Sequence, residues 1–436
     1  MKRHSFTGTC QAGEETSPML KTAAKAGGLA DRFRRVRATS AELARGLSPE
    51  DQVVQSMPDA SPVKWHLAHT TWFFETFLLI PNLPGYRPFD PAFGYLFNSY
   101  YEAIGARHPR PRRGLLTRPG VAEVAAYRDH VDAAMLTLLE RADAERLAPL
   151  ATLGLSHEEQ HQELILMDLL HLFSCNPVAP AYRPYRPALR GPAHEGRWIA
   201  VDGGIVAVGH GGEGFAFDNE GPRHEVLLRP FRLFSRAVTN GEWRAFIEDG
   251  GYRNPALWLS DGWATVNAEG WEAPAYWRRG EDGGWREFTL LGEHPLDEDA
   301  PVCHVGFYEA DAFARWAGKR LPTEAEWETA AAGLSPTGNT LGSGLLRPVA
   351  AGEGEGLVQM FGDVWEWTAS AYSGYPGFRP AVGAVGEYNG KFMANQYVLR
   401  GGCCATPDGH ARATYRNFFY PHQRWMFSGV RLAEDA

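Results

Sequence analysis

The chain has 436 residues, which is too long for one ordinary hydrophobic core, so two or three domains are expected. Its formal net charge of −9 argues against a general nucleic-acid binder, and no apolar run is long enough for a membrane span. The five cysteines are few, odd in number and scattered, which is typical of a reducing cytoplasm rather than a disulfide framework. Residues 1–28 are polar, lack a signal-peptide core and are predicted to be disordered.

The segment 29–176 has the composition of a helical bundle. Apolar patterns predict helices over residues 29–46, 63–80, 121–148 and 155–173, and bundles of this kind commonly hold metal sites in their cores. The connection 81–119 is long and rich in proline, glycine, tyrosine and arginine, which is more typical of a functional loop than of an idle one. Its arginine-rich part, 107–118, suits an anionic small molecule, and a plain solvated loop is the alternative.

The run Ser156–Glu163 carries the strongest chemical signal. His157 and His161 are spaced i, i+4 on a predicted helix, so both imidazoles project from one face and can bind one metal ion. The run also matches the H-E-x-x-H motif of zinc hydrolases, with Glu158 in the place of the general base. The glycine and third histidine that extend this motif in one protease group are missing. A solvated polar helix face is the other alternative.

A second histidine cluster lies upstream on the predicted helix 63–80. His66 and His69 stand in the sequence W-H-L-A-H, and a third imidazole from an antiparallel helix would complete a three-histidine set. Such a set leaves open metal positions for a substrate or oxygen. Only one of the two is needed, and their spacing does not choose between them. His171 lies further along the later helix and is interpreted as structural.

After the proline-rich linker 177–194, the chain changes to short strands and turns. Strands are predicted over 198–201, 204–208, 224–228 and 231–234, and helices over 239–250 and 308–317. Thr323 and Glu326 form a predicted capping box at the start of a further helix. Residues 195–436 therefore read as a loop-rich domain with mixed secondary structure.

Several motifs in this half resemble the formylglycine-generating-enzyme-like fold, a C-type-lectin-like α+β domain. They are R-L-P-T-E-A-E-W-E at 320–328, G-D-V-W-E-W at 362–367 and L-R-G-G at 399–402. The N-terminal half resembles the DinB-like four-helix bundle, whose metal is held by three histidines. The combination is similar to the EgtB-type sulfoxide synthases of ergothioneine biosynthesis. The expected fold class is thus α+β, with a DinB-like bundle followed by this domain.

The resemblance implies a chemistry. In that family, Fe(II) bound by three histidines uses O2 as co-substrate to couple a sulfur donor to C2 of the imidazole of hercynine, which is trimethylated histidine. The family's W-x-L-A-H segment maps its first ligand to His69, and the other two ligands map to His157 and His161.

Further site residues are carried over from the same resemblance. Tyr100 and Tyr101 match a tyrosine pair, one of which supplies a proton or hydrogen atom near the iron, and Gln160 would bind the substrate imidazole. Aromatic faces attract a quaternary ammonium group by roughly 0.5–2 kcal/mol. Ordinary core packing is the alternative for the phenylalanines. The remaining substrate-binding assignments are Arg416, Asn417, Phe418, Phe419 and Trp425. The active site is therefore expected between the bundle and the C-terminal domain, with Gln160 facing the segment 416–419.

The sequence departs from the family pattern near this segment. Cys403 and Cys404 stand together where serine then cysteine is usual, and Met426 replaces a glutamine. A softer pocket would suit the SenA-type selenoneine synthases, which take a selenosugar donor in place of cysteine or γ-glutamylcysteine. Neutral drift explains the changes equally well, so both donors stay open. The alternatives from other classes are a zinc-dependent thiol transferase or hydrolase, a copper-dependent formylglycine-generating oxidase, and a lectin-like binding protein without catalysis.

Overall fold

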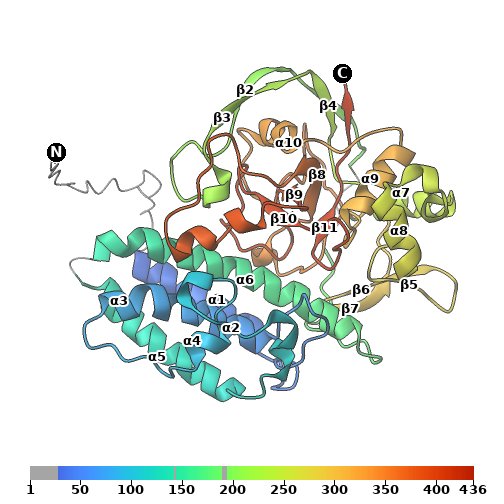
Figure 1. Ribbon diagram of the computed structural model, residues 1–436. Helices are drawn as coiled ribbons and strands as arrows, with labels where there is room; N and C mark the ends of the chain where they lie inside the picture. Colours follow the sequence, from blue (N-terminus) through green and yellow to red (C-terminus); the bar gives the residue numbers. More distant parts are fainter. Residues whose placement is uncertain (1–27, 142–143, 189–193) are drawn as a thin grey trace, which may run out of the picture.

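The computed structural model describes residues 28–141, 144–188 and 194–436. Figure 1 shows a layer of helices beneath a mixed α/β domain, with the long helix α6 lying along the boundary between them. Apart from Gly28, the predicted disorder of residues 1–28 concerns residues outside the described ranges. The described part of the predicted linker packs on both domains, because Tyr182 donates its amide to Leu290 at 2.8 Å and its hydroxyl to the Leu43 carbonyl at 2.7 Å.

The long helices of the N-terminal half are α1 (Leu29–Ala44), α2 (Val63–Phe74), α5 (Val121–Leu139) and α6 (Ala148–Ser174). The prediction of one helix over 121–148 is wrong, because α5 ends at Leu139 and a 3-10 turn (Ala144–Leu147) precedes α6. Pro149 explains the new start, since proline is favoured in the first turn of a helix and disfavoured inside one. The helix predicted over 63–80 continues beyond α2 as a π-helical turn (η2, Glu75–Leu79) and a short α3 (Ile80–Asn82).

The connection 81–119 is ordered rather than structureless. It contains the short helical segments α4 (Phe93–Leu96), η3 (Glu102–Ile104) and η4 (Arg110–Leu115). The Lys64 ammonium, at the start of α2, binds the carbonyls of Leu116 and Pro119 at 2.5 and 2.9 Å. These bonds fasten the end of the loop to the helix that carries His69.

The C-terminal domain is built from small sheets. The predicted strands are confirmed as β1 (Trp198–Val201), β2 (Gly204–Val208), β3 (His224–Leu228) and β4 (Phe231–Phe234). The other strands are β5 (Trp277–Arg279), β6 (Trp285–Thr289), β7 (Gly292–Pro295), β8 (Trp365–Ala371), β9 (Tyr397–Arg400), β10 (Asn417–Phe419), β11 (Ser428–Gly429) and β12 (Ala433–Asp435). The strands form four sheets, with the orders β1-β4-β12, β2-β3, β5-β6-β7 and β10-β9-β8-β11. The helices of this domain are α7 (Asn240–Glu248), α8 (Ser260–Glu269), α9 (Phe307–Trp316) and α10 (Glu324–Ala331).

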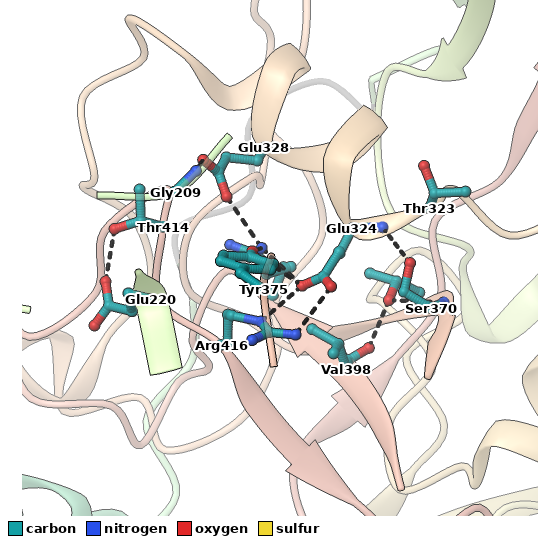
Figure 2. A network of polar contacts seen from close by, with 12 residues as sticks. Gly209, Glu220, Thr323, Glu324, Glu328, Ser370, Tyr375, Val398, Thr414 and Arg416 are labelled. Atoms are coloured by element: carbon teal, nitrogen blue, oxygen red, sulfur yellow. Dashed lines mark hydrogen bonds and ion pairs between the residues drawn. The ribbon is translucent and has the colours of Figure 1, made fainter. Parts of the chain in front are cut away.

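The predicted capping box at α10 is confirmed. The Thr323 hydroxyl accepts the amide of Glu326 at 3.2 Å, and the Glu326 carboxylate accepts the amide of Thr323 at 2.8 Å. The same helix carries a buried charge network, drawn in Figure 2, in which Glu324 binds Arg416 through both carboxylate oxygens at 2.9 and 3.0 Å. Arg400 joins this network at 2.9 Å from Glu324 and so ties α10 to β9.

A second buried network holds the bundle together around Glu158. One carboxylate oxygen binds Arg37 at 2.9 Å, and the other binds Arg128 at 3.1 Å and Ser40 at 2.7 Å. Burial alone would raise the pKa of this carboxyl, but the two guanidinium groups outweigh burial and lower the pKa to about 2. The carboxylate therefore joins α6 to α1 and α5 as a charged group.

Close approach of α6 to α2 depends on a glycine. A Cβ atom at Gly154 would lie 2.8 Å from the Phe74 ring and 2.9 Å from the Phe73 ring, which is closer than real side chains pack. Gly154 lies one turn before His157. The missing side chain therefore allows the histidine faces of α2 and α6 to meet.

Replacing Glu158 with glutamine should destabilise the protein strongly. The change leaves Arg128 buried without a carboxylate, and removing one partner of a buried ion pair costs about 3–5 kcal/mol. Chemical denaturation at neutral pH measures the free energy of unfolding. Asp31→Asn is the matched control, because its ion pair with Arg34 is exposed and should contribute no more than about 1 kcal/mol. Equal losses in the two variants would contradict this account.

Candidate metal centre and active site

Three buried histidines converge in the bundle. His69 on α2 and His157 and His161 on α6 each offer a ring nitrogen, and these nitrogens lie within 4.8 Å of one another. Within the described ranges, no other set of at least three histidine, cysteine, aspartate or glutamate side chains meets this geometry. The i, i+4 pair on one helix face thus meets one imidazole from a neighbouring helix.

Three of the buried ring nitrogens in this cluster have no hydrogen-bond partner. His69 donates from Nδ1 to the Phe97 carbonyl at 2.6 Å, which leaves its Nε2 unbonded, and both nitrogens of His157 are unbonded. Burial lowers the pKa of His157 to about 3 and also lowers the pKa of His69 and His161, so the rings are neutral. Neutral imidazoles with free lone pairs are what a metal ion needs, and an unpaired buried nitrogen is otherwise costly. These residues fit a bound metal.

His66 supports the cluster and does not belong to it. Its Nε2 lies 3.1 Å from the Asp168 carboxylate, and its Nδ1 lies 2.8 Å from Nδ1 of His161. Since the carboxylate can only accept, His66 donates from Nε2 and accepts at Nδ1 from His161. The Nε2 of His161 is then left for a metal. The structure thus places His69, and not His66, in the three-histidine cluster. A carboxylate–histidine support of this kind is typical of metal sites.

His171 and Glu158 lie outside the centre. His171 binds the Ser56 hydroxyl through Nδ1 at 2.7 Å, as expected for a structural residue. The Glu158 carboxylate binds Arg37 and Arg128 and is not a member of the three-histidine cluster. The interpretation of H-E-x-x-H as a zinc hydrolase motif is therefore wrong, because its general base cannot reach a metal-bound water.

Gln160 faces the C-terminal domain one turn after His157. Its Nε2 donates to the hydroxyl of Tyr415 at 2.7 Å, and its Oε1 accepts the hydroxyl of Tyr388. The Tyr388 ring also packs edge-on against His157, with 5.5 Å between ring centroids. Sequence reasoning missed both tyrosines. Tyr415 directly precedes the segment 416–419 that was predicted to bind substrate. The predicted segment therefore begins one residue after the side chain that contacts Gln160.

The expectation that Gln160 faces Arg416 to Phe419 is corrected by these contacts. Arg416 is fully buried, and its guanidinium donates to Glu324 and to the carbonyls of Asn219 and Ser373. The bond to Glu324 connects the start of β10 to α10 (Figure 2). Neighbouring side chains along an extended segment point to opposite sides, which is why Tyr415 and not Arg416 reaches the bundle. The other members of the set lie as follows: Asn417 binds the Phe418 amide, Phe418 stacks on Tyr372 at 4.0 Å, Phe419 packs against Trp425, and Trp425 donates to Asp168 at 3.1 Å.

Tyr100 and Tyr101 lie on the same side of the centre as Tyr388. Their rings are 4.7 Å apart, and the Tyr100 ring is 6.1 Å from that of Tyr388. The Tyr101 hydroxyl is buried without a hydrogen-bond partner. Burial raises the pKa of all three phenols, so each keeps its proton at neutral pH.

The two halves of the chain match two known families. Residues 32–171 match the DinB superfamily, and residues 189–436 match the sulfatase-modifying factor enzyme 1-like domain. The chain is 36% identical over 411 residues to the hercynine oxygenase of Mycolicibacterium thermoresistibile, covering 87% of this chain and 88% of that protein. It is also 36% identical over 405 residues to the hercynine oxygenase of Mycobacterium tuberculosis, covering 87% and 92%.

The chain belongs to the hercynine oxygenase family. Its C-terminal part is also 34% identical over 302 residues to the formylglycine-generating enzyme of Streptomyces coelicolor, covering 57% of this chain and 92% of that enzyme. The expected α+β fold class and the resemblance to EgtB-type enzymes are confirmed. In the part of the chain that the structure describes, no helix is long and apolar enough to cross a membrane.

In this hercynine oxygenase relative, a buried arginine lies beside the metal centre. Arg113 stacks on Trp65 at 3.3 Å, and Trp65 in turn stacks on His69 at 4.6 Å. It donates to the hydroxyls of Ser61 and Ser99 at 2.9 and 3.1 Å, its Nε has no partner, and no described residue forms an ion pair with it. Burial and the nearby Arg110 lower its pKa, and the Asp168 carboxylate offsets this only in part. The basic loop thus presents to the site one buried charge that has no direct ion pair among the described residues.

The unusual cysteines lie at the domain interface. Cys403 is fully buried with its sulfur 3.5 Å from the Thr406 hydroxyl, and that hydroxyl donates to Glu163 of α6 at 2.6 Å. Burial raises the pKa of Cys403 and Cys404, so both are neutral thiols. Met426 is also fully buried. Cys403 thus lies close to Glu163 of α6, and all three buried side chains are uncharged.

Metal analysis should find about one ion per chain, and alanine at His69, His157 or His161 should abolish stoichiometric binding because each removes a ligand. His66→Asn should weaken metal affinity by about 10–100-fold, the usual effect of losing a residue that supports a ligand. His171→Asn is the control and should bind metal like the wild type. Full metal content in any of the three alanine variants would refute the assignment of that residue as a ligand.

Proposed function

We propose that this protein is an Fe(II)- and O2-dependent enzyme that forms a carbon–sulfur or carbon–selenium bond at C2 of the hercynine imidazole. The observation that carries this proposal is the three-histidine centre with unpaired nitrogens, set beside Gln160 and Tyr388, in a chain of the hercynine oxygenase family. His69, His157 and His161 would hold the iron. When bound, the ion supplies redox chemistry with O2 and open positions for a thiolate or selenolate.

With a thiol donor, the overall reaction balances on one O2. The imidazole C2–H and the donor S–H bonds break, a C–S and an S–O bond form, and the second oxygen atom leaves as water. O2 accepts the four electrons that the two substrates lose. The protein's part is to hold both substrates next to the metal, to exclude water, and to provide a proton at the right position.

Gln160 is proposed to bind the imidazole of hercynine. Its Nε2 donates one hydrogen to Tyr415 and has a second hydrogen free for an imidazole nitrogen. For the trimethylammonium group, we propose the ring cluster of Tyr100, Phe392 and Phe418, in which Phe392 lies 5.3 Å from Tyr100 and 6.1 Å from Phe418. Phe418 thus keeps its predicted role through this cluster. The roles of Asn417, Phe419 and Trp425 in substrate binding stay predictions.

Arg113 is proposed to bind the donor. A buried guanidinium next to the metal centre, without a direct ion pair among the described residues, suits the carboxylate of cysteine or γ-glutamylcysteine, and it would also donate to the hydroxyls of a selenosugar. We propose that the uncharged side chains of Cys403, Cys404 and Met426 line the donor site, where they would suit a polarisable chalcogen of either kind. The two donor classes therefore need to be compared directly.

Tyr388 is proposed as the residue that supplies a proton or hydrogen atom during turnover, with Tyr100 and Tyr101 as the other candidates. Its hydroxyl reaches Gln160, and its ring lies against the ligand His157. Because burial raises the pKa of Tyr388, its phenol is protonated at neutral pH and has a proton to donate during turnover. Without this group, the same chemistry would oxidise the donor alone to a sulfinate.

Mass spectrometry of products tests the proposed function. Protein loaded with Fe(II) is supplied with O2 and hercynine, and with cysteine, γ-glutamylcysteine or a selenosugar in parallel. A product that joins hercynine to one donor is expected, because the site holds both substrates at one metal. Protein loaded with Zn(II) is the control and should give no product. Absence of every coupled product, with hercynine recovered unchanged, would remove this function.

The three tyrosines are separated by single replacements with phenylalanine. Tyr388→Phe should lower coupled product by at least about 100-fold, the lower range for a positioned proton donor, while oxidised donor or uncoupled O2 consumption rises. Tyr100→Phe and Tyr101→Phe should change the ratio of coupled to uncoupled product less. Hercynine binding and iron content should be retained in all three. If Tyr100→Phe or Tyr101→Phe has the larger effect on that ratio, the role belongs to that residue and not to Tyr388.

Replacing Arg113 with glutamine should raise the KM for the donor by about 10–100-fold, since a charge-assisted hydrogen bond contributes about 1.5–3 kcal/mol. The KM for hercynine should change little. Arg112→Gln is the matched control, because Arg112 is exposed on the same turn. Steady-state kinetics with each substrate varied in turn provide the comparison. If the KM for the donor is unchanged in Arg113→Gln, Arg113 does not bind the donor.

A further inference from the structure

The hydrogen bonds around Gln160 continue beyond Tyr415 to a buried histidine. The Nε2 atom of His410 lies 3.3 Å from the Tyr415 hydroxyl, and its Nδ1 atom lies 3.0 Å from a carboxylate oxygen of Glu159. The same oxygen of Glu159 accepts Arg32 at 3.1 Å. The chain therefore runs from α6 into the C-terminal domain and back to α6.

The Glu159 end determines the direction of every bond in this chain. A carboxylate can only accept, so His410 donates from Nδ1, and a ring with a single N–H then accepts at Nε2. The Tyr415 hydroxyl then gives its hydrogen to His410, and its oxygen accepts from Gln160 Nε2. With Nε2 on that side, Gln160 turns Oε1 toward Tyr388 and accepts its hydroxyl hydrogen. Every hydrogen bond in this chain is therefore donated in the same direction, from Tyr388 toward Glu159.

The orientation of Gln160 has no other support of this kind. The nitrogen and oxygen of a side-chain amide have almost the same size, so packing alone does not distinguish the two orientations. If the Tyr415 hydroxyl no longer gave its hydrogen to His410, it could donate to Gln160 instead, and the amide would turn over. Gln160 would then present a carbonyl oxygen where the proposed imidazole nitrogen needs a donor, and Tyr388 would lose its acceptor.

We propose that His410, held by Glu159, is a positioning residue that fixes the amide of Gln160 so that it presents an N–H to hercynine and an oxygen to Tyr388. The inference rests on the proposed function for the identity of the substrate. It assigns to His410 and Tyr415 a role in substrate recognition although neither is proposed to touch the reacting atoms.

The test compares His410→Leu, His410→Gln and Tyr415→Phe in the full-length protein loaded with Fe(II). His410→Leu removes the acceptor for the Tyr415 hydroxyl, whereas in His410→Gln the amide oxygen can take the place of Nε2. We expect His410→Leu and Tyr415→Phe to raise the Kd and KM for hercynine about 10-fold and to increase uncoupled O2 consumption. His410→Gln should restore most of the affinity, and the KM for the donor and the iron content should stay at wild-type values.

A double-mutant cycle separates positioning from a general structural effect. In a Gln160→Met background, where there is no amide to orient, His410→Leu should have no further effect on the Kd for hercynine. An equal 10-fold loss in both backgrounds overturns the proposal, and so does unchanged hercynine affinity in His410→Leu. If His410→Leu does not fold, Tyr415→Phe breaks the same chain at the next bond and decides by the same measurements.

Neutron diffraction of the crystallised protein makes the test independent of the substrate. It locates the hydrogens of the Gln160 amide directly, whether or not hercynine binds. If wild-type protein does not bind hercynine, the proposed function is refuted, but neutron diffraction still determines the orientation of the Gln160 amide. An amide with Oε1 facing Tyr415 in the wild type would overturn the positioning role itself.

Discussion

Helix α6 is held from two sides by buried carboxylates, and the arrangement of the site depends on this. On the bundle side, Glu158 binds Arg37 and Arg128. On the other side, Glu163 accepts the indole N–H of Trp365 at 2.6 Å and the hydroxyl of Thr406 at 2.6 Å, both from the C-terminal domain. His157 and His161 of the three-histidine cluster lie on the same helix, close to these anchors. The helix therefore cannot turn or slide without breaking buried charged contacts, so the position of its histidines is preset.

The site is also prepared for ligands by groups that the fold leaves unsatisfied. The free nitrogens of His69 and His157, the unpaired Tyr101 hydroxyl and the unpaired Nε of Arg113 all lie around one centre. Each unsatisfied buried group costs about 1–3 kcal/mol, and such groups are rare in a folded interior. Other unpaired buried atoms are scattered over the rest of the described chain. This group differs because it includes three histidine nitrogens in one cluster, which fits a metal ion as the missing partner. The rest of the chain, including the Glu324 network, supplies the stability that offsets this cost.

Much of the architecture could be predicted from the sequence because it is local. The i, i+4 spacing of His157 and His161, the alternating strands at the start of the C-terminal domain and the capping box of Thr323 each depend on residues close in the chain. The one helix that was predicted too long failed because the strong proline start of α6 overrode a continuous apolar pattern. The choice of His69 over His66 needed the family resemblance, since both lie on the inner side of α2.

The contacts that complete the site could not be read in the same way. Tyr388 and Gln160 are 228 residues apart, and nothing in the local pattern around Tyr388 distinguishes it from the other tyrosines. Tyr415 was missed by one position, because a short extended segment alternates its side chains and a motif match does not say which side faces the bundle. His410 carries no motif at all, and only its place between Glu159 and Tyr415 reveals its connection to the site.

The two domains contribute different parts of the proposed site. Gln160 follows His157 by three residues on α6, so the helix itself sets the distance between the amide and the metal ligands. In the proposed scheme, the C-terminal domain would set only the orientation of that amide, through Tyr388, Tyr415 and His410, and the side chains that face the donor, through Cys403 and Met426. The metal chemistry can therefore stay constant while substitutions in the C-terminal domain alter substrate recognition. The departures from the family pattern at residues 403 and 426 fall in the part of the molecule where a change of donor could occur without disturbing the metal.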